Sequence, residues 1–164
     1  MTPSALSRLD RYARDQPRCV AGPAASSDVD AAERRIGMPL HPDFREFVLR
    51  YGGALIGSLP VYGVRTAEMM GDPAFETFDE VTLRFRGDAW PGTRDWVVIS
   101  TDLGGNPIGL ASEGDVWTCD HDAGELLLLA PTFEAFVLGL LDEAEASVAQ
   151  WGAAVALRFP PRRP

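Results

Sequence analysis

The hydrophobic residues of this chain recur with a helical period near its start and again near its end. Phe44, Phe47, Val48 and Tyr51 have the i, i+3, i+4, i+7 spacing that places them on one face of a helix. A similar stripe begins at Phe133 and continues for two turns. Together with weaker repeats near the start of the chain, these stripes predict four helices, over residues 4–15, 28–35, 42–51 and from 132 onward.

Between the helices the residues favour short strands. The segment 96–100 (WVVIS) is rich in β-branched and aromatic side chains, and segments 108–111 and 116–120 follow it after turns at 102–107 and 112–115. Because tight turns join antiparallel neighbours, these segments predict a three-stranded meander over about 96–120. The remaining expectations are strands at 59–64 and 126–129, a helical turn at 66–70 and an acidic linker at 71–80.

The order of these elements predicts an α+β fold, with a mostly antiparallel sheet flanked by N-terminal helices and a C-terminal helix. The length of 164 residues suits a single domain, which we expect over residues 1–157. Residues 158–164 (RFPPRRP) are expected to form a mobile tail. The residues expected in the core include Phe44, Phe47, Phe136, Trp96, Val98 and Trp117.

The charges are unevenly distributed along the chain. The formal net charge is −9, all 15 cationic side chains are arginines, and residues 51–164 hold 7 Arg against 17 Asp and Glu. Residues 95–157 contain 11 acids and no arginine. Such a surface repels nucleic acid, whose phosphates need clustered cations, and attracts a basic partner. The alternative is a solvated acidic face that only keeps the protein in solution.

The sequence predicts neither a signal peptide nor a membrane-spanning segment. No basic region followed by an apolar run begins the chain, and the uncharged apolar-rich run 146–157 is shorter than the about 20 residues of a spanning helix. Cys19 and Cys119 are too far apart in the sequence to form a metal-binding motif. We therefore expect a cytoplasmic protein with two reduced thiols and no membrane partner.

Few residues suggest catalysis. His41 precedes Pro42 and is expected to flank a helix, whereas His121 lies between Asp120 and Asp122. Carboxylates beside an imidazole can bind a divalent metal or transfer protons, which would suit a metal-assisted hydrolase, but the same segment also reads as a polar turn. No nucleophile or phosphate-binding motif is present. We therefore predict no catalytic residue, no cofactor and no enzyme activity.

A partner-binding surface is the stronger hypothesis. We expect five acids to lie on the loops at one end of the meander and to attract a cationic partner. An aromatic side chain in the loop 89–92 could supply the anchor for that partner. The predicted surface consists of Glu113, Asp115, Asp120, Asp122, Glu125 and Trp90.

Three further acids occupy an unusual position. Asp142, Glu143 and Glu145 follow the apolar stripe of the last predicted helix. Acids at a helix C-terminus are disfavoured by the macrodipole, by a few tenths of a kcal/mol each. Their presence therefore suggests a role outside the helix itself.

Several segments, in order, are similar to one family. These segments are 28–37 (DVDAAERRIG), 38–47 (MPLHPDFREF), 51–53 (YGG), 96–106, 116–122 and 132–136 (TFEAF). Over about residues 28–141 the chain resembles the SUKH superfamily, the group around the fungal Smi/Knr cell-wall regulator and many bacterial immunity proteins. Pro39-Leu40 and His41-Pro42 depart from the usual motif.

The resemblance implies an α+β domain that binds proteins and has no shared catalytic residues. In bacteria such domains neutralise polymorphic toxins, often nucleases, so it implies a cognate basic toxin domain as the partner, bound so that the toxin's active site is occluded. A general regulatory scaffold is the alternative function. The protein itself is expected to be a monomer or a weak dimer.

Overall fold

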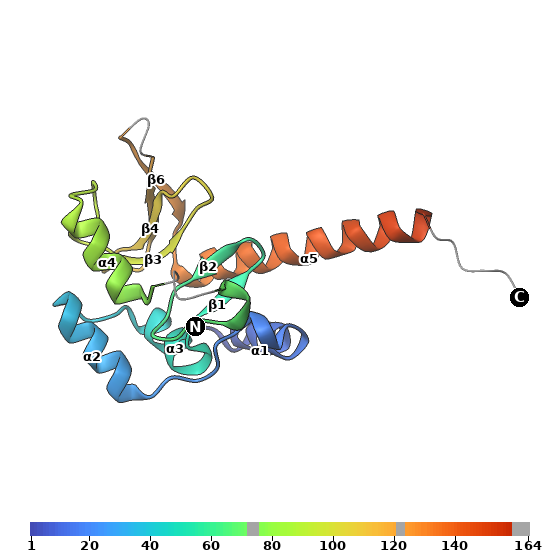
Figure 1. Cartoon of the computed structure of the whole chain (residues 1–164), viewed down its shortest axis with the longest axis horizontal. Helices are drawn as coiled ribbons and strands as arrows, with labels where there is room; N and C mark the ends of the chain where they lie inside the picture. Colours follow the sequence, from blue (N-terminus) through green and yellow to red (C-terminus); the bar gives the residue numbers. More distant parts are fainter. Residues whose placement is uncertain (72–75, 121–123, 159–164) are drawn as a thin grey trace, which may run out of the picture.

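A computed structural model describes residues 1–71, 76–120 and 124–158, and Figure 1 shows its course. The helices are α1 (Pro3–Asp15), α2 (Ser26–Ile36), α3 (Pro42–Tyr51), α4 (Phe78–Gly87) and α5 (Phe133–Arg158), with single 3-10 turns η1 (Pro17–Cys19) and η2 (Glu68–Met70). The strands are β1 (Ala54–Ile56), β2 (Leu59–Val61), β3 (Val97–Thr101), β4 (Pro107–Leu110), β5 (Val116–Cys119) and β6 (Leu126–Ala130).

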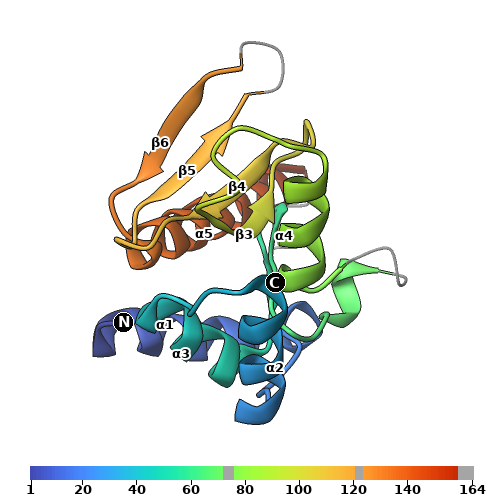
Figure 2. The same cartoon turned by 90° about the vertical axis from the view of Figure 1, so that its left-hand side faces the viewer.

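The main sheet is an antiparallel meander. Its strand order is β3-β4-β5-β6, and a separate hairpin joins β1 to β2. The predicted strands at 96–100, 108–111 and 116–120 are confirmed to within a residue, as is the short fourth strand. Helices α1 to α3 lie together below the sheet and α5 runs behind it (Figure 2). The α+β class predicted from the sequence is therefore confirmed.

Local capping fixes where the helices begin and end. The His41 Nδ1 atom accepts a hydrogen bond from the Asp43 N–H at 3.3 Å at the start of α3, so His41 is a capping residue, as expected. Gly52 ends α3 with a φ of 70°, a conformation that glycine adopts without strain. Thr132 caps α5 by accepting from the Ala135 N–H at 3.0 Å.

Aromatic rings from three helices fill the centre of the core. Phe44 of α3 lies 5.5 Å from Phe78 of α4 and 5.3 Å from Phe133 of α5, measured between ring centroids, and both contacts are edge-on. Phe47 is also fully buried, and Phe136 is 8% exposed. The predicted core positions are confirmed for these phenylalanines, for Val98 and for Trp96, whereas Trp117 is only half-buried.

Helix α4 was not predicted, and it begins within the last three residues of the expected linker at 71–80 and continues to Gly87. Glu80 accepts hydrogen bonds from the Thr77 N–H at 2.8 Å and from the Thr77 hydroxyl at 2.9 Å, which caps the first turn. Phe78, Val81 and Phe85 then bury one face of the helix. The prediction of a linker was wrong for residues 78–80, because the acidic composition hid this apolar stripe, and residues 72–75 lie outside the described residues.

Helix α5 is longer than its apolar stripe. This length explains why acids follow the stripe without being at the end of the helix. Asp142 and Glu145 lie in the middle of α5, because the helix continues to Arg158. The negative end of the helix dipole therefore does not destabilise these two acids. Arg8 of α1 contacts Asp142 at 2.8 Å and Glu145 at 3.2 Å, and Arg11 contacts Glu145 at 3.2 Å. These two acids therefore hold α1 against α5.

Candidate partner-binding surface

The predicted acidic surface is not gathered at one end of the meander. Glu113 and Asp115 precede β5, whereas Asp120 and Glu125 follow it. Successive turns of a meander lie at opposite ends of its strands, so the length of β5, about 3.3 Å per residue, separates the two pairs. The prediction of a single acidic end was wrong. Asp122 lies outside the described residues.

Trp90 lies at the same end of the sheet as Asp120. Both line a hollow of about 270 Å³ together with Asp88, Pro91 and Cys119. Trp90 is half-buried and packs edge-on against Phe85, 5.3 Å away between ring centroids. The indole is therefore held in place by the core and presents part of its surface to the hollow.

The β5–β6 hairpin fixes the other wall of this hollow. The Asp120 N–H donates to the Glu125 carbonyl at 3.0 Å, and the Gly124 N–H donates to the Asp120 carbonyl at 2.7 Å. Burial raises the pKa of the Cys119 thiol, and the charge of Asp120 raises this pKa further. The thiol is therefore kept in its protonated, unreactive form, as the sequence predicted.

The opposite end of the sheet is occupied by structural contacts. Asp115 accepts a hydrogen bond from the Trp117 indole N–H. Gly114, with a φ of 98°, lies so close to His41 that a Cβ there would stand 2.8 Å from the His41 Nε2 atom. His41 thus packs the start of α3 against the β4–β5 turn, and Glu113 is an exposed acid on that turn.

A run of four exposed apolar side chains was not predicted from the sequence. We call it the leucine edge, and it consists of the four leucines of β6, the last strand of the sheet, which are 44–53% exposed. A solvated antiparallel edge strand normally alternates apolar and polar residues. The run of four leucines was visible in the sequence, but their exposure was not. The members of the leucine edge are Leu126, Leu127, Leu128 and Leu129.

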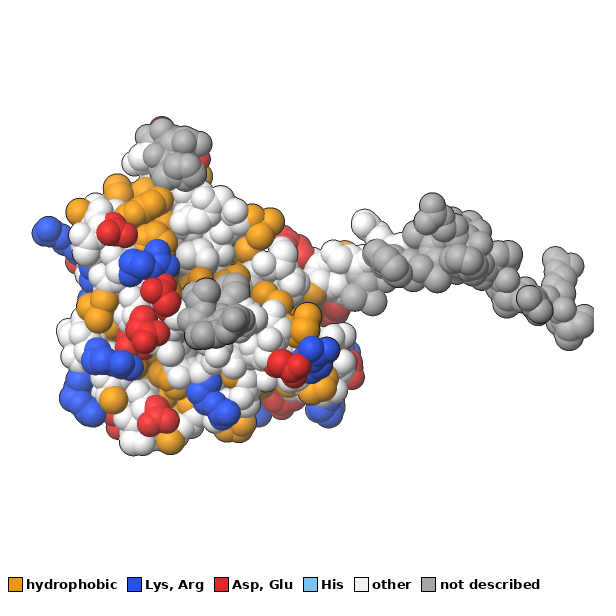
Figure 3. Space-filling model, in the orientation of Figure 1, with side chains coloured by type: hydrophobic (Ala, Val, Ile, Leu, Met, Phe, Trp, Pro, Cys, Tyr) orange, Lys and Arg blue, Asp and Glu red, His pale blue; other side chains and the backbone are white. Residues whose placement is uncertain are grey.

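The leucine edge is apolar on both faces of the sheet. Leu128 pairs with Trp117 across the β5–β6 ladder, so Leu126, Leu128 and the half-buried indole share one face. On the other face, Leu129 lines a hollow of about 350 Å³ beside Phe136 of α5. Figure 2 shows β6 as the outermost strand of the sheet. On the face that Figure 3 shows, acidic, basic and hydrophobic side chains are mixed over the body of the molecule.

This arrangement suits association with a protein more than chemistry. An edge strand offers backbone N–H and C=O groups that a further strand can pair with, and apolar side chains on both of its faces can pack against that strand. No group of three His, Cys, Asp or Glu residues could hold a metal within residues 1–71, 76–120 and 124–158. His121 and Asp122 of the suggested metal site lie outside these ranges.

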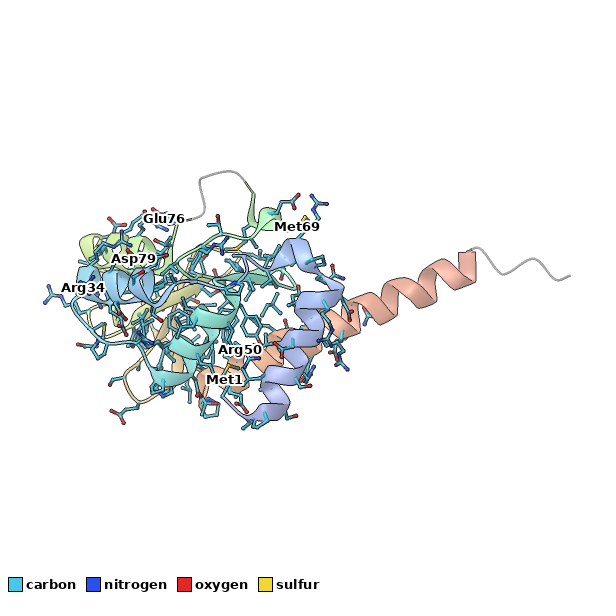
Figure 4. All side chains as sticks on the ribbon, turned by 90° about the horizontal axis from the view of Figure 1, so that it is seen from below. Met1, Arg34, Arg50, Met69, Glu76 and Asp79 are labelled. Carbon is cyan, nitrogen blue, oxygen red and sulfur yellow. The ribbon has the colours of Figure 1, made fainter. Side chains whose placement is uncertain are left out.

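A buried ion pair joins α2 to α4 on the far side of the core from β6. Asp79 is fully buried, and its Oδ2 atom lies 2.7 Å from the guanidinium of Arg35, which is 55% exposed. The Asp79 Oδ1 atom has no hydrogen-bond partner among the described residues. Figure 4 labels Asp79 beside Arg34, which is a neighbour of Arg35 on α2. We assign this pair a structural role, because it links two helices.

No helix within the described part of the chain combines the length and apolarity needed to cross a bilayer.

Comparison with known proteins identifies one family. The model of the SMI1 / KNR4 family (SUKH-1) matches residues 23–139, which is more than half of the chain. The match includes α2 to α4, the whole meander and the start of α5, and it leaves out α1 and the rest of α5. No curated protein matches the chain.

Proposed function

The chain belongs to the SMI1 / KNR4 family (SUKH-1), and we propose on this basis that it is a non-enzymatic immunity protein that binds a cognate toxin domain and occludes its active site. Domains of this family are known as immunity-type, protein-binding domains. The observation that carries the proposal for this chain is the leucine edge, which exposes four apolar side chains on the edge strand of the sheet.

The leucine edge can bind a partner in two ways at once. A strand of the toxin domain pairs with the backbone of β6, and its side chains pack against Leu126 and Leu128 on one face of the sheet. The hollow beside Phe136 accepts an apolar side chain on the other face. The leucines supply affinity, because half of each side chain is still exposed to water and can be buried on binding.

Charge adds specificity for a basic toxin domain. Glu125 directly precedes the leucine edge, and Asp120 and Trp90 lie at the same end of the sheet. Acids at the rim of an interface accelerate the encounter with a cationic partner, such as a nuclease whose active site holds phosphates. Of the acids predicted as a binding surface, Asp120 and Glu125 are the two that can act together with the leucines.

Protection of cells from the toxin tests the proposal. Candidate toxin domains from the same genome are expressed one at a time with the wild-type protein, with a Leu126→Glu/Leu128→Glu variant, or with a Leu103→Glu control. Leu103 is 85% exposed but lies on the β3–β4 turn, away from β6. We expect growth with wild type and with the control, and growth arrest with the double variant. Protection that survives the double variant would remove the leucine edge from the account.

A further inference from the structure

The second half of α5 extends away from the rest of the molecule. Figures 1 and 4 show this helix continuing well beyond every other element. The sequence of residues 146–157 contains no charged residue, and it includes Trp151 and Leu157. A helix that lacks a charged face is normally covered by other protein. The helical backbone and this sequence together indicate that a partner packs along α5.

A groove lies where α5 leaves the body. It consists of two adjoining hollows of about 390 and 410 Å³, which share Tyr12, Gln16 and Ala144 as lining residues. Helix α1 forms one wall and α5 the other, and Cys19 and Gly57 close one end. The Tyr12 hydroxyl donates to the Leu55 carbonyl at 2.7 Å, which holds its ring in the groove wall.

The rim of this groove carries two carboxylates that are unpaired among the described residues, and Arg8 and Arg11 also line its first hollow. Asp15 lines the first hollow and Glu143 the second, and neither forms an ion pair within the residues that the structure describes. Glu145, by contrast, is already paired with Arg8 and Arg11. The second hollow, which is lined by Glu143 and, within the described part of the chain, by no arginine, therefore suits a segment that combines apolar residues with arginine.

The end of α5 is such a segment. Arg158 is the first arginine after Arg94, it directly follows Leu157, and Arg162 and Arg163 come after it. The groove of the same molecule is out of reach of Arg158, because a helix rises about 1.5 Å per residue and so separates Arg158 from Glu143 by about 22 Å. A second copy of the chain can bring its own Arg158 to that place.

We propose that two copies of this chain form a two-fold dimer in which their α5 helices pack antiparallel, and in which the arginine-bearing end of each α5 enters the groove between α1 and α5 of the other. Setting Arg158 opposite Glu143 of the second copy places Leu157 opposite Ala144 and Gln150 opposite Trp151. Every contact occurs twice, as a two-fold interface requires. This dimer is independent of toxin binding, since β6 is not part of it.

A charge exchange tests the register of this dimer. The molar mass of the full chain is measured by sedimentation equilibrium over a concentration series. We expect a dimer for wild type, at least tenfold weaker association for Glu143→Arg, and recovery of wild-type association for Glu143→Arg/Arg158→Glu. Glu113→Arg is the matched control, because this exposed acid lies on the β4–β5 turn and should leave the association unchanged.

Cross-linking tests the direction of the helices. Cys19 lines the groove together with Ala144, whereas Cys119 is buried. In the proposed register a Leu157→Cys variant places its new thiol beside Cys19 of the second copy. Mild oxidation should therefore produce a disulfide-linked dimer, and Leu157→Cys/Cys19→Ser should not form one.

Three results would overturn the proposal. Wild-type protein that stays monomeric at its highest soluble concentration excludes the dimer. If Glu143→Arg/Arg158→Glu associates as weakly as Glu143→Arg alone, Arg158 does not lie opposite Glu143 of the second copy, and the proposed register is excluded. A cross-linked dimer that persists without Cys19 shows two copies of residue 157 in contact, which requires parallel helices.

Discussion

Truncation of Phe44 to Ala tests whether one aromatic cluster holds the helices together. Phe44 is fully buried and contacts Phe78 of α4 and Phe133 of α5, both of which are themselves fully buried. Removal of a buried Phe side chain costs about 3–5 kcal/mol of unfolding free energy. We expect a loss of about 4–5 kcal/mol, because three packed helices surround the site and cannot collapse into the cavity.

Phe136 provides an internal comparison. Its side chain is 8% exposed and lines the hollow between the sheet and α5, so water and neighbouring groups can relax into the space that truncation leaves. We expect Phe136→Ala to cost about 3 kcal/mol, at the lower end of the same range. The two substitutions remove the same atoms, so the difference between them measures how tightly each site is enclosed.

Urea unfolding followed by circular dichroism measures both losses. The slope of unfolding free energy against urea should stay constant, so that the shift in midpoint reports stability alone. Leu103→Ala, at a residue that is 85% exposed, should stay within about 0.5 kcal/mol of wild type. A loss below about 2 kcal/mol for Phe44→Ala, or a larger loss for Phe136→Ala, would refute the account of the core.

Three further outcomes are expected. Arg35→Met should lower the unfolding free energy by about 3 kcal/mol, because it leaves the buried carboxylate of Asp79 unpaired, and adding Asp79→Leu should recover most of this loss in a double-mutant cycle. Thr77→Ala removes the hydroxyl that caps α4 and should cost about 1 kcal/mol in the same urea assay. Glu125→Arg should slow association with the toxin domain and flatten its dependence on salt in stopped-flow kinetics, with an unchanged rate contradicting the role of this acid.

Much of the fold could be predicted because local patterns and tertiary packing agree. The stripe from Phe44 to Tyr51 defines α3, and the tight turns around β4 define the meander. Helix α4 was missed although Thr77 and Glu80 form a capping box that is visible in the sequence, because the acidic composition of 71–80 suggested a linker.

The candidate surface was harder to predict, since exposure depends on the whole fold. The run of leucines at 126–129 was predicted as a strand, but only the position of β6 at the sheet edge exposes these residues. The separation of Asp115 from Asp120 did follow from the predicted meander, because adjacent turns lie at opposite ends of a strand. The pairing of Arg8 and Arg11 with α5 required the three-dimensional structure, because more than 130 residues separate the partners.

Binding of the purified toxin domain tests the central claim most directly. Calorimetric titration of the toxin domain that the wild-type protein neutralises in cells should give one toxin per chain for the wild-type protein and for Leu103→Glu. Each substitution at a buried interface leucine should cost about 2 kcal/mol, which is about 30-fold in affinity. Leu126→Glu/Leu128→Glu should therefore weaken binding by several hundredfold while its circular dichroism spectrum stays unchanged. Wild-type affinity in this folded double variant would contradict the claim that the leucine edge binds the toxin.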